Sequence, residues 1–148
     1  MELFERAALS PLTAARVLGA LALMCAGVVH LQQFFSLYSA VPTIGTLFVL
    51  NFLGAMAIGL GLLAPLERIL GRRGDAAVSL LALAGTAMAG TAFAFLLIAE
   101  HATLFGWTEA GYYSTAVVLA LTTEAITVVL LGAFLVVRLA RRASPQSA

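Results

Sequence analysis

The chain has 148 residues, of which 62% are hydrophobic and 10% are charged, and its mean hydropathy is +1.06. Soluble domains are closer to half apolar and a quarter charged, so this composition excludes an ordinary soluble globular protein. The net charge of +1 gives no reason to expect nucleic acid as a partner. We therefore expect a single all-α domain, residues 1–148, that lies among membrane lipids as an integral membrane four-helix bundle.

The start of the chain predicts an interfacial helix followed by a first membrane span. Residues 1–10 place Leu3 and Phe4 on one helical face together with two alanines, which suits a short helix on the membrane surface. Pro11 stands at a favoured first position of the next helix. We expect that helix to cross the membrane over about residues 13–35.

The next two spans carry small residues at helical spacing. After a break at Pro42, we expect the second span over about 45–65 and the third over about 76–99. Small residues four positions apart let membrane helices approach closely, so they predict faces that pack against another helix. The residues of these faces are Ala55, Gly59, Gly61, Gly85 and Gly90.

Two connections and the end of the chain complete the organisation. The segment 67–75 is charged and bounded by glycine, which predicts an aqueous turn. Residues 101–113 contain glycines and aromatic residues but no basic residue, as is typical of a loop at the membrane interface. The fourth span is expected over about 114–137, and the polar tail 143–148 is expected to be disordered.

Every basic residue is an arginine, and all eight fall on one side of the expected spans. They are Arg6, Arg16, Arg68, Arg72, Arg73, Arg138, Arg141 and Arg142. The positive-inside rule therefore predicts that the N and C termini are cytoplasmic and that both aromatic loops lie outside. A lysine-free chain rich in alanine, leucine, glycine and valine is typical of GC-rich bacterial genomes, so we expect the inner (plasma) membrane of a bacterium.

Three polar side chains from three spans share one depth in the membrane. At about 1.5 Å per residue, His30, Asn51 and Glu124 each lie roughly 21 to 24 Å from the charged residue at the cytoplasmic end of their span. This depth is the outer third of the bilayer. Gln33, Thr122 and Thr123 lie close to this depth, and Glu100 and His101 lie further out.

Ionisable groups within a span are costly and point to a functional site. One interpretation is a pocket open to the outside, in which His30 and Glu124 form a proton-titrating or ligand-binding pair. The other is a hydrogen-bonded cluster that only fixes helix packing. The residues themselves leave both interpretations open.

The cofactor signals are weak. The only histidines, His30 and His101, suggest haem ligation in a four-helix bundle, but their counted depths differ by about two turns. Quinone is the other cofactor we consider. No HxxxH or CxxC spacing, phosphate loop or nucleophile elbow occurs, so we predict neither a metal site nor catalytic residues.

Aromatic residues gather at the expected outer interface: Phe34, Tyr38, Trp107, Tyr112 and Tyr113. Aromatic belts are common at this depth of a membrane protein. The alternative is a stacking surface for a lipid, a quinone or a partner subunit.

The first half of the chain contains Gly27-Val-Val-His30, then Tyr38-Ser-Ala-Val-Pro42, and then a glycine-rich stretch at 54–63. On these motifs, which lie within residues 16–63, the chain resembles the DoxX-like small four-helix bacterial membrane proteins. The resemblance implies a four-helix bundle that is sometimes attached to membrane redox or quinone chemistry. It singles out His30, Tyr38 and Pro42.

Two functions remain as hypotheses. The first is a non-enzymatic accessory or structural subunit whose glycine-rich and aromatic faces pack against other membrane subunits or a second copy of the chain. The alternative is a small proton-coupled transporter, or a membrane protein that binds quinone, haem or lipid. This alternative uses the polar pocket of His30, Asn51 and Glu124.

Overall fold

The computed structural model describes residues 10–106, 108 and 114–143. They form four long helices, α2 (Pro11–Ser36), α3 (Pro42–Leu63), α5 (Arg72–Ala99) and α6 (Thr115–Ala143). Two short helices, η1 (Tyr38–Ala40) and α4 (Leu66–Leu70), lie in the connections. Each of the four long helices is long and apolar enough to cross a membrane. The predictions of an all-helical fold and of four candidate spans are therefore confirmed.

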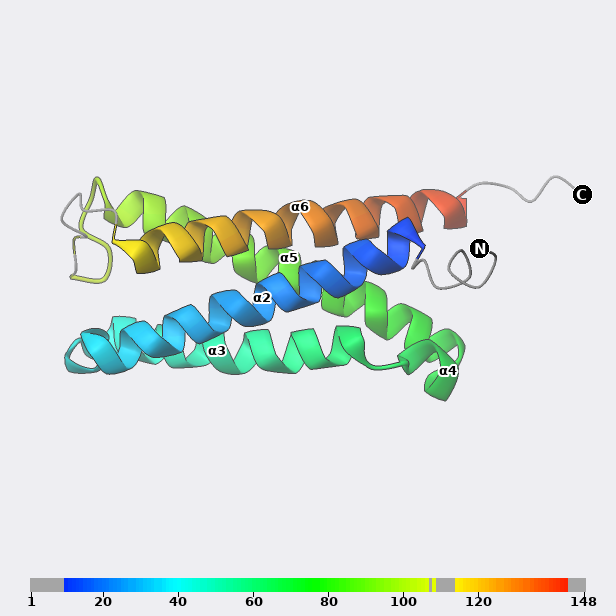
Figure 1. Ribbon diagram of the computed structural model, residues 1–148, viewed down its shortest axis with the longest axis horizontal. Coiled ribbons are helices and arrows are strands. Elements are labelled where there is room, and N and C mark those ends of the chain that lie inside the picture. The colour runs from blue at the N-terminus through cyan, green and yellow to red at the C-terminus, as the bar shows by residue number, and fades with distance from the viewer. Residues whose placement is uncertain (1–9, 107, 109–113, 144–148) are drawn as a thin grey trace, which may run out of the picture.

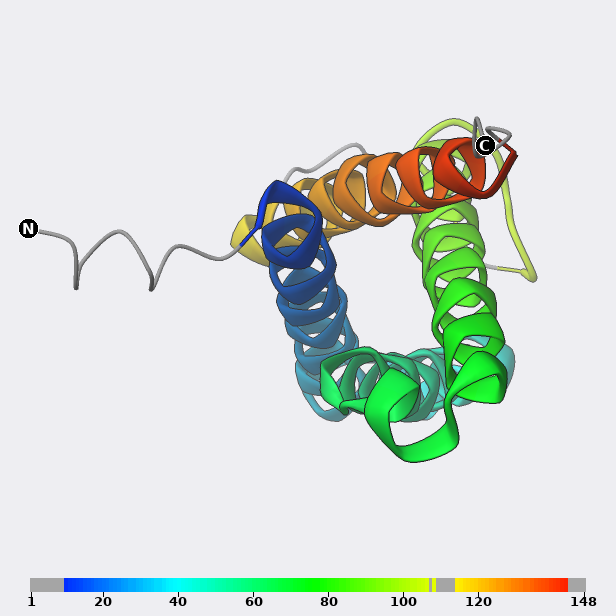
Figure 2. The same cartoon turned by 90° about the vertical axis from the view of Figure 1, so that its right-hand side faces the viewer.

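The four long helices stand at the four sides of a square when the bundle is viewed along its length (Figure 2). Going round the square, α2 lies beside α3 and α6, and α5 lies beside the same two helices on the opposite side. Figure 1 shows α4, the start of α2 and the end of α6 at one end of the bundle, which we call the arginine end. The other end, with η1 and the residues after α5, is called the loop end.

Local signals set the helix starts. Ser10 caps α2, because its hydroxyl oxygen accepts the backbone N–H of Thr13 at 3.2 Å. Pro11 and Pro42 open α2 and α3 at the first turn, where a missing N–H costs nothing. The expected interfacial helix at 1–10 lies outside the described residues except for this cap, and the expected disordered tail lies outside them except for Ala143.

The segment 67–75, which we expected to be an aqueous turn, is largely helical. It contains most of α4 and the first turn of α5, and only Gly71, at φ +53°, separates the two helices. A side chain at Gly74 would overlap the backbone carbonyl of Leu66, so glycine is what lets α5 fold back against α4. Charge in this segment does not oppose helix formation, since Asp75 lies favourably in the first turn of α5.

The centre of the bundle is built on close contacts between leucine and glycine. A Cβ placed on Gly19 of α2 would lie 2.7 Å from Leu131 Cδ2, and one on Gly85 of α5 would lie 2.9 Å from Leu131 Cδ1. Both distances are too short for real carbon atoms, so Leu131 of α6 fits only because both positions are glycine. Leu23 completes this fully buried centre.

The structure places the residues of the expected packing faces in different surroundings. Ala55 and Gly59 face α2, where Gly27 and Met24 contact them, and Gly61 faces Leu81 of α5. Gly90 is less crowded, because a Cβ there would meet only Val128, at an ordinary 3.8 Å. Most of these small residues therefore serve contacts within this chain.

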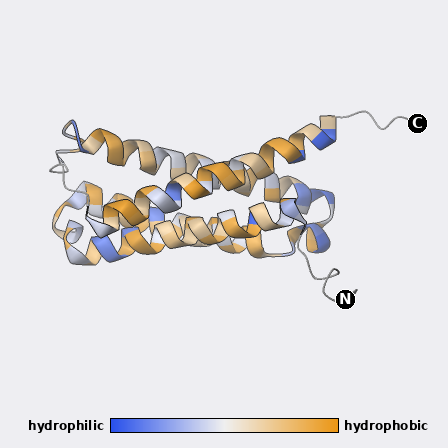
Figure 3. Cartoon of the chain, turned by 45° about the horizontal axis from the view of Figure 1, so that its top comes forward, coloured by the Kyte–Doolittle hydropathy of each residue, from blue (hydrophilic) through white to orange (hydrophobic). Residues whose placement is uncertain are grey.

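Apolar residues cover the middle of all four long helices, and hydrophilic residues gather toward the two ends of the bundle (Figure 3). Many large apolar side chains on the outside are exposed, among them Leu18, Leu53, Leu80 and Val129. An exposed apolar belt of this kind is costly in water and suits a bilayer.

Candidate functional site

A cavity of about 470 Å³ lies in the loop-end half of the bundle. All four long helices contribute to its wall, and so does the segment that follows α5. Most of the lining side chains are apolar, and its polar residues are His30, Gln33, Tyr38, Asn51 and Thr91. This size and this mixture are those of a site for a small organic molecule.

His30 lines the cavity, and Glu124 lies next to it, behind the wall. His30 Nε2 lies 3.6 Å from Glu124 Oε1, and His30 Nδ1 lies 2.9 Å from the backbone oxygen of Ala26. The Glu124 side chain is 1% exposed, and neither of its oxygens has a hydrogen-bond partner among the described residues. A buried carboxyl with no partner is expensive, so this position is not explained by packing alone.

Asn51 and Gln33 supply the polar part of the cavity wall. Both side chains line the cavity from neighbouring helices, α3 and α2. Neither side chain makes a hydrogen bond to another described residue. An amide carries both donors and an acceptor, so each of these side chains is free to bond a polar group in the cavity.

Aromatic rings bound the cavity toward the loop end. The ring of Phe48 lies 4.9 Å from that of His30, edge to face, and 4.7 Å from the ring of Tyr38. Phe95 and Phe105, which also line the cavity, form a second pair whose ring centroids lie 5.8 Å apart. Phe105 adopts φ +52°, a left-handed conformation that is strained for a phenylalanine and is found mainly where the surrounding contacts require it.

The structure brings some of the residues that the sequence singled out together and leaves others apart. The structure brings together His30, Gln33, Asn51 and Glu124, and Tyr38 joins them at the cavity. Phe34 does not line this cavity and packs against Gly45 instead. Glu100 and His101 are not among the lining residues either, and Trp107, Tyr112 and Tyr113 lie outside the described residues.

The geometry does not fit haem held by two histidines. Both ring nitrogens of His30 already face protein atoms, and His101 is exposed beyond the end of α5. Within the described part of the chain, no group of three or more histidine, cysteine, aspartate or glutamate residues is placed to hold a metal ion.

Sequence reasoning missed several cavity residues, among them Phe48, Met88, Thr91, Phe95 and Phe105. It searched for ionisable groups, whereas most of this wall is apolar. The one available signal was the recurrence of Ala87, Thr91 and Phe95 at intervals of four, which places them on one face of α5.

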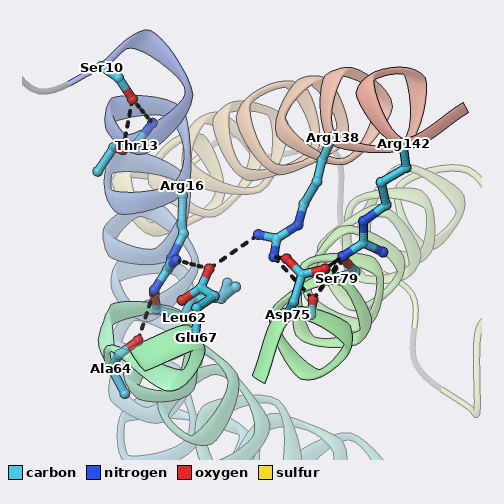
Figure 4. A network of polar contacts seen from close by, with 10 residues as sticks. All are labelled: Ser10, Thr13, Arg16, Leu62, Ala64, Glu67, Asp75, Ser79, Arg138 and Arg142. Carbon is cyan, nitrogen blue, oxygen red and sulfur yellow. Dashed lines mark hydrogen bonds and ion pairs between the residues drawn. The ribbon is translucent and has the colours of Figure 1, made fainter. Parts of the chain in front are cut away.

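Sequence reasoning also missed a second polar cluster, at the arginine end (Figure 4). Arg16 of α2 and Arg138 of α6 both donate to Glu67 Oε1, at 2.7 Å and 3.3 Å. Arg138 and Arg142 both form ion pairs with Asp75 of α5. Two carboxylates therefore bind three arginines and connect every long helix except α3 through side chains.

The same cluster reaches α3 through backbone carbonyls. Arg16 Nε donates to the oxygen of Leu62 at 2.5 Å, and Arg16 Nη2 donates to that of Ala64 at 2.8 Å. These two carbonyls lie at the C-terminal end of α3, where no N–H group of the helix follows to bond them. Arg16 thus caps α3 and binds Glu67 at once.

The arginines also set the ionisation of Glu67. Burial raises the pKa of this carboxyl, but a hydrogen bond to its own backbone, together with Arg16 and Arg138, lowers the pKa by more. The net pKa is below the ordinary value of 4.5, so the carboxylate is the stable form.

Comparison of the chain with protein-family models, with curated proteins and with solved structures gives no match.

Proposed function

We propose that this protein is a ligand-binding membrane protein whose loop-end cavity takes a neutral, mainly apolar molecule with one polar group. The observation that carries the proposal is the cavity itself, since about 470 Å³ of space remains at the junction of four helices that otherwise pack through glycine contacts. A protein interior leaves few such spaces without a reason. Quinones and single-chain lipids both have the required chemistry.

In this proposal Asn51 and Gln33 bond the polar group of the ligand. Their amides are the free hydrogen-bonding groups of α3 and α2 in the wall, and a carbonyl or hydroxyl suits both. The rest of the wall, including Ile44, Leu96 and Val117, contacts the apolar part. A charged ligand is disfavoured, because no arginine, aspartate or glutamate among the described residues lines the cavity.

His30 and Glu124 hold a single proton between them. The Ala26 oxygen can only accept, so His30 Nδ1 carries a hydrogen and Nε2 is left to face the carboxyl of Glu124. The low-dielectric interior favours a pair with no net charge, which requires one proton shared by Nε2 and the carboxyl. A ligand that exchanges a proton would find it one side chain away from the cavity.

We further propose the orientation that the arginines indicate, with the arginine end in the cytoplasm and the cavity in the outer half of the membrane. The accessory-subunit hypothesis receives less support. That hypothesis relied on Gly59 and Gly85 as contact points for another subunit, but these glycines pack against Met24 and Leu131 of the same chain.

Ligand-induced stabilisation in detergent tests the binding function. The probes are a short-tailed quinone and a long-chain alcohol, added to the purified protein while its melting temperature is followed by circular dichroism. A ligand that binds only the folded state raises that temperature. Ala92 lines the cavity, so the larger side chain of Ala92→Phe should fill the space and abolish the temperature shift. Ala84→Phe, at an exposed position of the same helix that does not line the cavity, should preserve the shift.

Two further variants separate the polar contacts from the fold. Asn51→Leu should remove most of the shift, and Glu124→Gln should reduce it while both proteins keep the helical content of the wild type. Shifts of equal size in the wild type and in Ala92→Phe would contradict binding in this cavity. An absence of any shift with either probe would contradict the proposed ligand class.

A further inference from the structure

The wall of the cavity is not equally buried on all sides. Its lining residues on α2 and α6 are all buried or half-buried. In contrast, α3 contributes Leu47 and Leu50, which are exposed, with Leu50 at 57%. The exposed residues that α5 contributes are Ala87, Thr91 and Phe95.

Close contacts at glycines join the other pairs of neighbouring helices: Gly45 lies against Phe34 near the loop end of α3 and α2, and Gly85 lies against Leu131 between α5 and α6. Gly27 lies against Ala55 between α2 and α3, and Gly19 lies against Leu131 between α2 and α6. Between α3 and α5 the close contacts found at glycines are Gly54 to Met88 and Gly61 to Leu81. Between α3 and α5, no comparable contact is found at the described glycines nearer the loop end, which is where the exposed lining residues of these two helices lie.

The opening between α3 and α5 is bounded by four apolar side chains and one polar side chain, that of Thr91. Leu47 and Leu50 form one rim, and Ala87, Thr91 and Phe95 form the other. All of these residues belong to helices that are long and apolar enough to cross a membrane. Hydrocarbon, not water, is the solvent that this rim suits.

We propose that ligands reach the cavity sideways from the bilayer, between α3 and α5, and that the ligand is a lipid-like molecule whose tail lies in this opening. This inference rests on the proposed binding function and names the class of ligand. The polar group would lie at Asn51 and Gln33, and the tail would run past Leu50 and Phe95 into the surrounding acyl chains. Such a ligand never has to leave the membrane to bind.

Fluorescence quenching by lipids with brominated acyl chains tests this path. The only tryptophan, Trp107, is replaced by phenylalanine, and Phe48→Trp then places a reporter in the cavity wall. The protein is reconstituted in nanodiscs of phosphatidylcholine with or without bromine. Phe35→Trp, on the lipid-facing surface, gives the upper reference for quenching, and Phe134→Trp, in the buried core, gives the lower one.

We expect bromine to reduce the fluorescence of the cavity reporter by a fraction close to that at the surface. Thr91→Phe narrows the opening and should restore the fluorescence. Ala84→Phe, on the same face of α5 but about two turns nearer the arginine end and outside the cavity lining, should not. Quenching no stronger than at the buried reference overturns the lateral path. Quenching that Thr91→Phe leaves unchanged overturns its placement between α3 and α5.

The two proposals fail in different ways. A melting-temperature shift with the quinone or the alcohol, together with no quenching of the cavity reporter, leaves the binding function standing and removes the lateral path. Quenching without any shift shows an open cavity that acyl chains enter but that does not bind either probe, and this removes the binding function.

Discussion

The charge cluster at the arginine end predicts a large effect of one nearly isosteric substitution, Glu67→Gln. This change leaves the shape of the side chain intact but removes the carboxylate that Arg16 and Arg138 both contact. Because Arg16 is only 16% exposed, it would be left as a largely buried charge with a weaker partner, whereas Arg138, at 12% exposed, would keep its ion pair with Asp75. Glu67 itself is 32% exposed, so part of the interaction is screened by solvent.

The expected loss of unfolding free energy lies between that for an exposed ion pair and that for a fully buried one. Exposed ion pairs contribute about 0 to 1 kcal/mol, and breaking a fully buried pair costs about 3 to 5 kcal/mol. For this partly buried site we expect Glu67→Gln to lower the free energy of unfolding by about 1 to 3 kcal/mol. Arg73→Gln serves as the control, since Arg73 is exposed and its side chain makes no hydrogen bond or ion pair with another described residue.

The pH dependence has a definite sign. The pKa of Glu67 is lower in the folded protein than its ordinary value of 4.5, so its contribution to stability is complete above that pH. As the pH falls below 4.5 and through the folded pKa, the carboxylate is protonated and the contribution is lost. The wild type should therefore lose more stability on acidification than Glu67→Gln does.

Unfolding by denaturing detergent, followed by circular dichroism in mixed micelles, measures both quantities. The experiment compares the wild type, Glu67→Gln and Arg73→Gln at neutral pH and again below pH 4.5. Equal unfolding free energies for wild type and Glu67→Gln at neutral pH would refute the claim that this cluster holds the helices together. Parallel acid profiles for those two proteins would refute the assignment of the pH dependence to Glu67.

Two further predictions concern the packing of the bundle and the buried carboxyl. Gly59→Leu should lower the melting temperature strongly, because its side chain would overlap Met24, whereas Gly132→Leu, which faces open space, should leave it nearly unchanged; equal effects would argue against the packing of α2 on α3. Glu124→Met should raise the free energy of unfolding by about 1 to 3 kcal/mol, since it replaces an unpartnered buried carboxyl by an apolar side chain of similar length. Lower stability of this variant in the same unfolding assay would show that the attraction between Glu124 and His30, whose Nε2 lies 3.6 Å from Oε1, outweighs the cost of burial.

The sequence was sufficient for the helices and for part of the site. The length and hydropathy of each apolar stretch predict a helix long and apolar enough to cross a membrane, because a backbone in lipid must satisfy its own hydrogen bonds locally. His30, Asn51 and Glu124 were also identifiable, since a polar residue in an apolar run stands out wherever the neighbouring helices lie. Counting residues from one end even placed them at a common depth, because the rise per helical residue is constant.

What the sequence left open depends on how the helices pack. The partners of Arg16 and Arg138, the cavity between the helices and its opening between α3 and α5 all join residues that are far apart in the chain. Contacts of this kind depend on helix rotation and on which glycine accepts which side chain, as Gly19 and Gly85 accept Leu131. Hydropathy is a property of single residues and determines neither the rotation of a helix nor the partner of a glycine. Only the tertiary structure therefore decided where the arginines are bound and where the cavity opens.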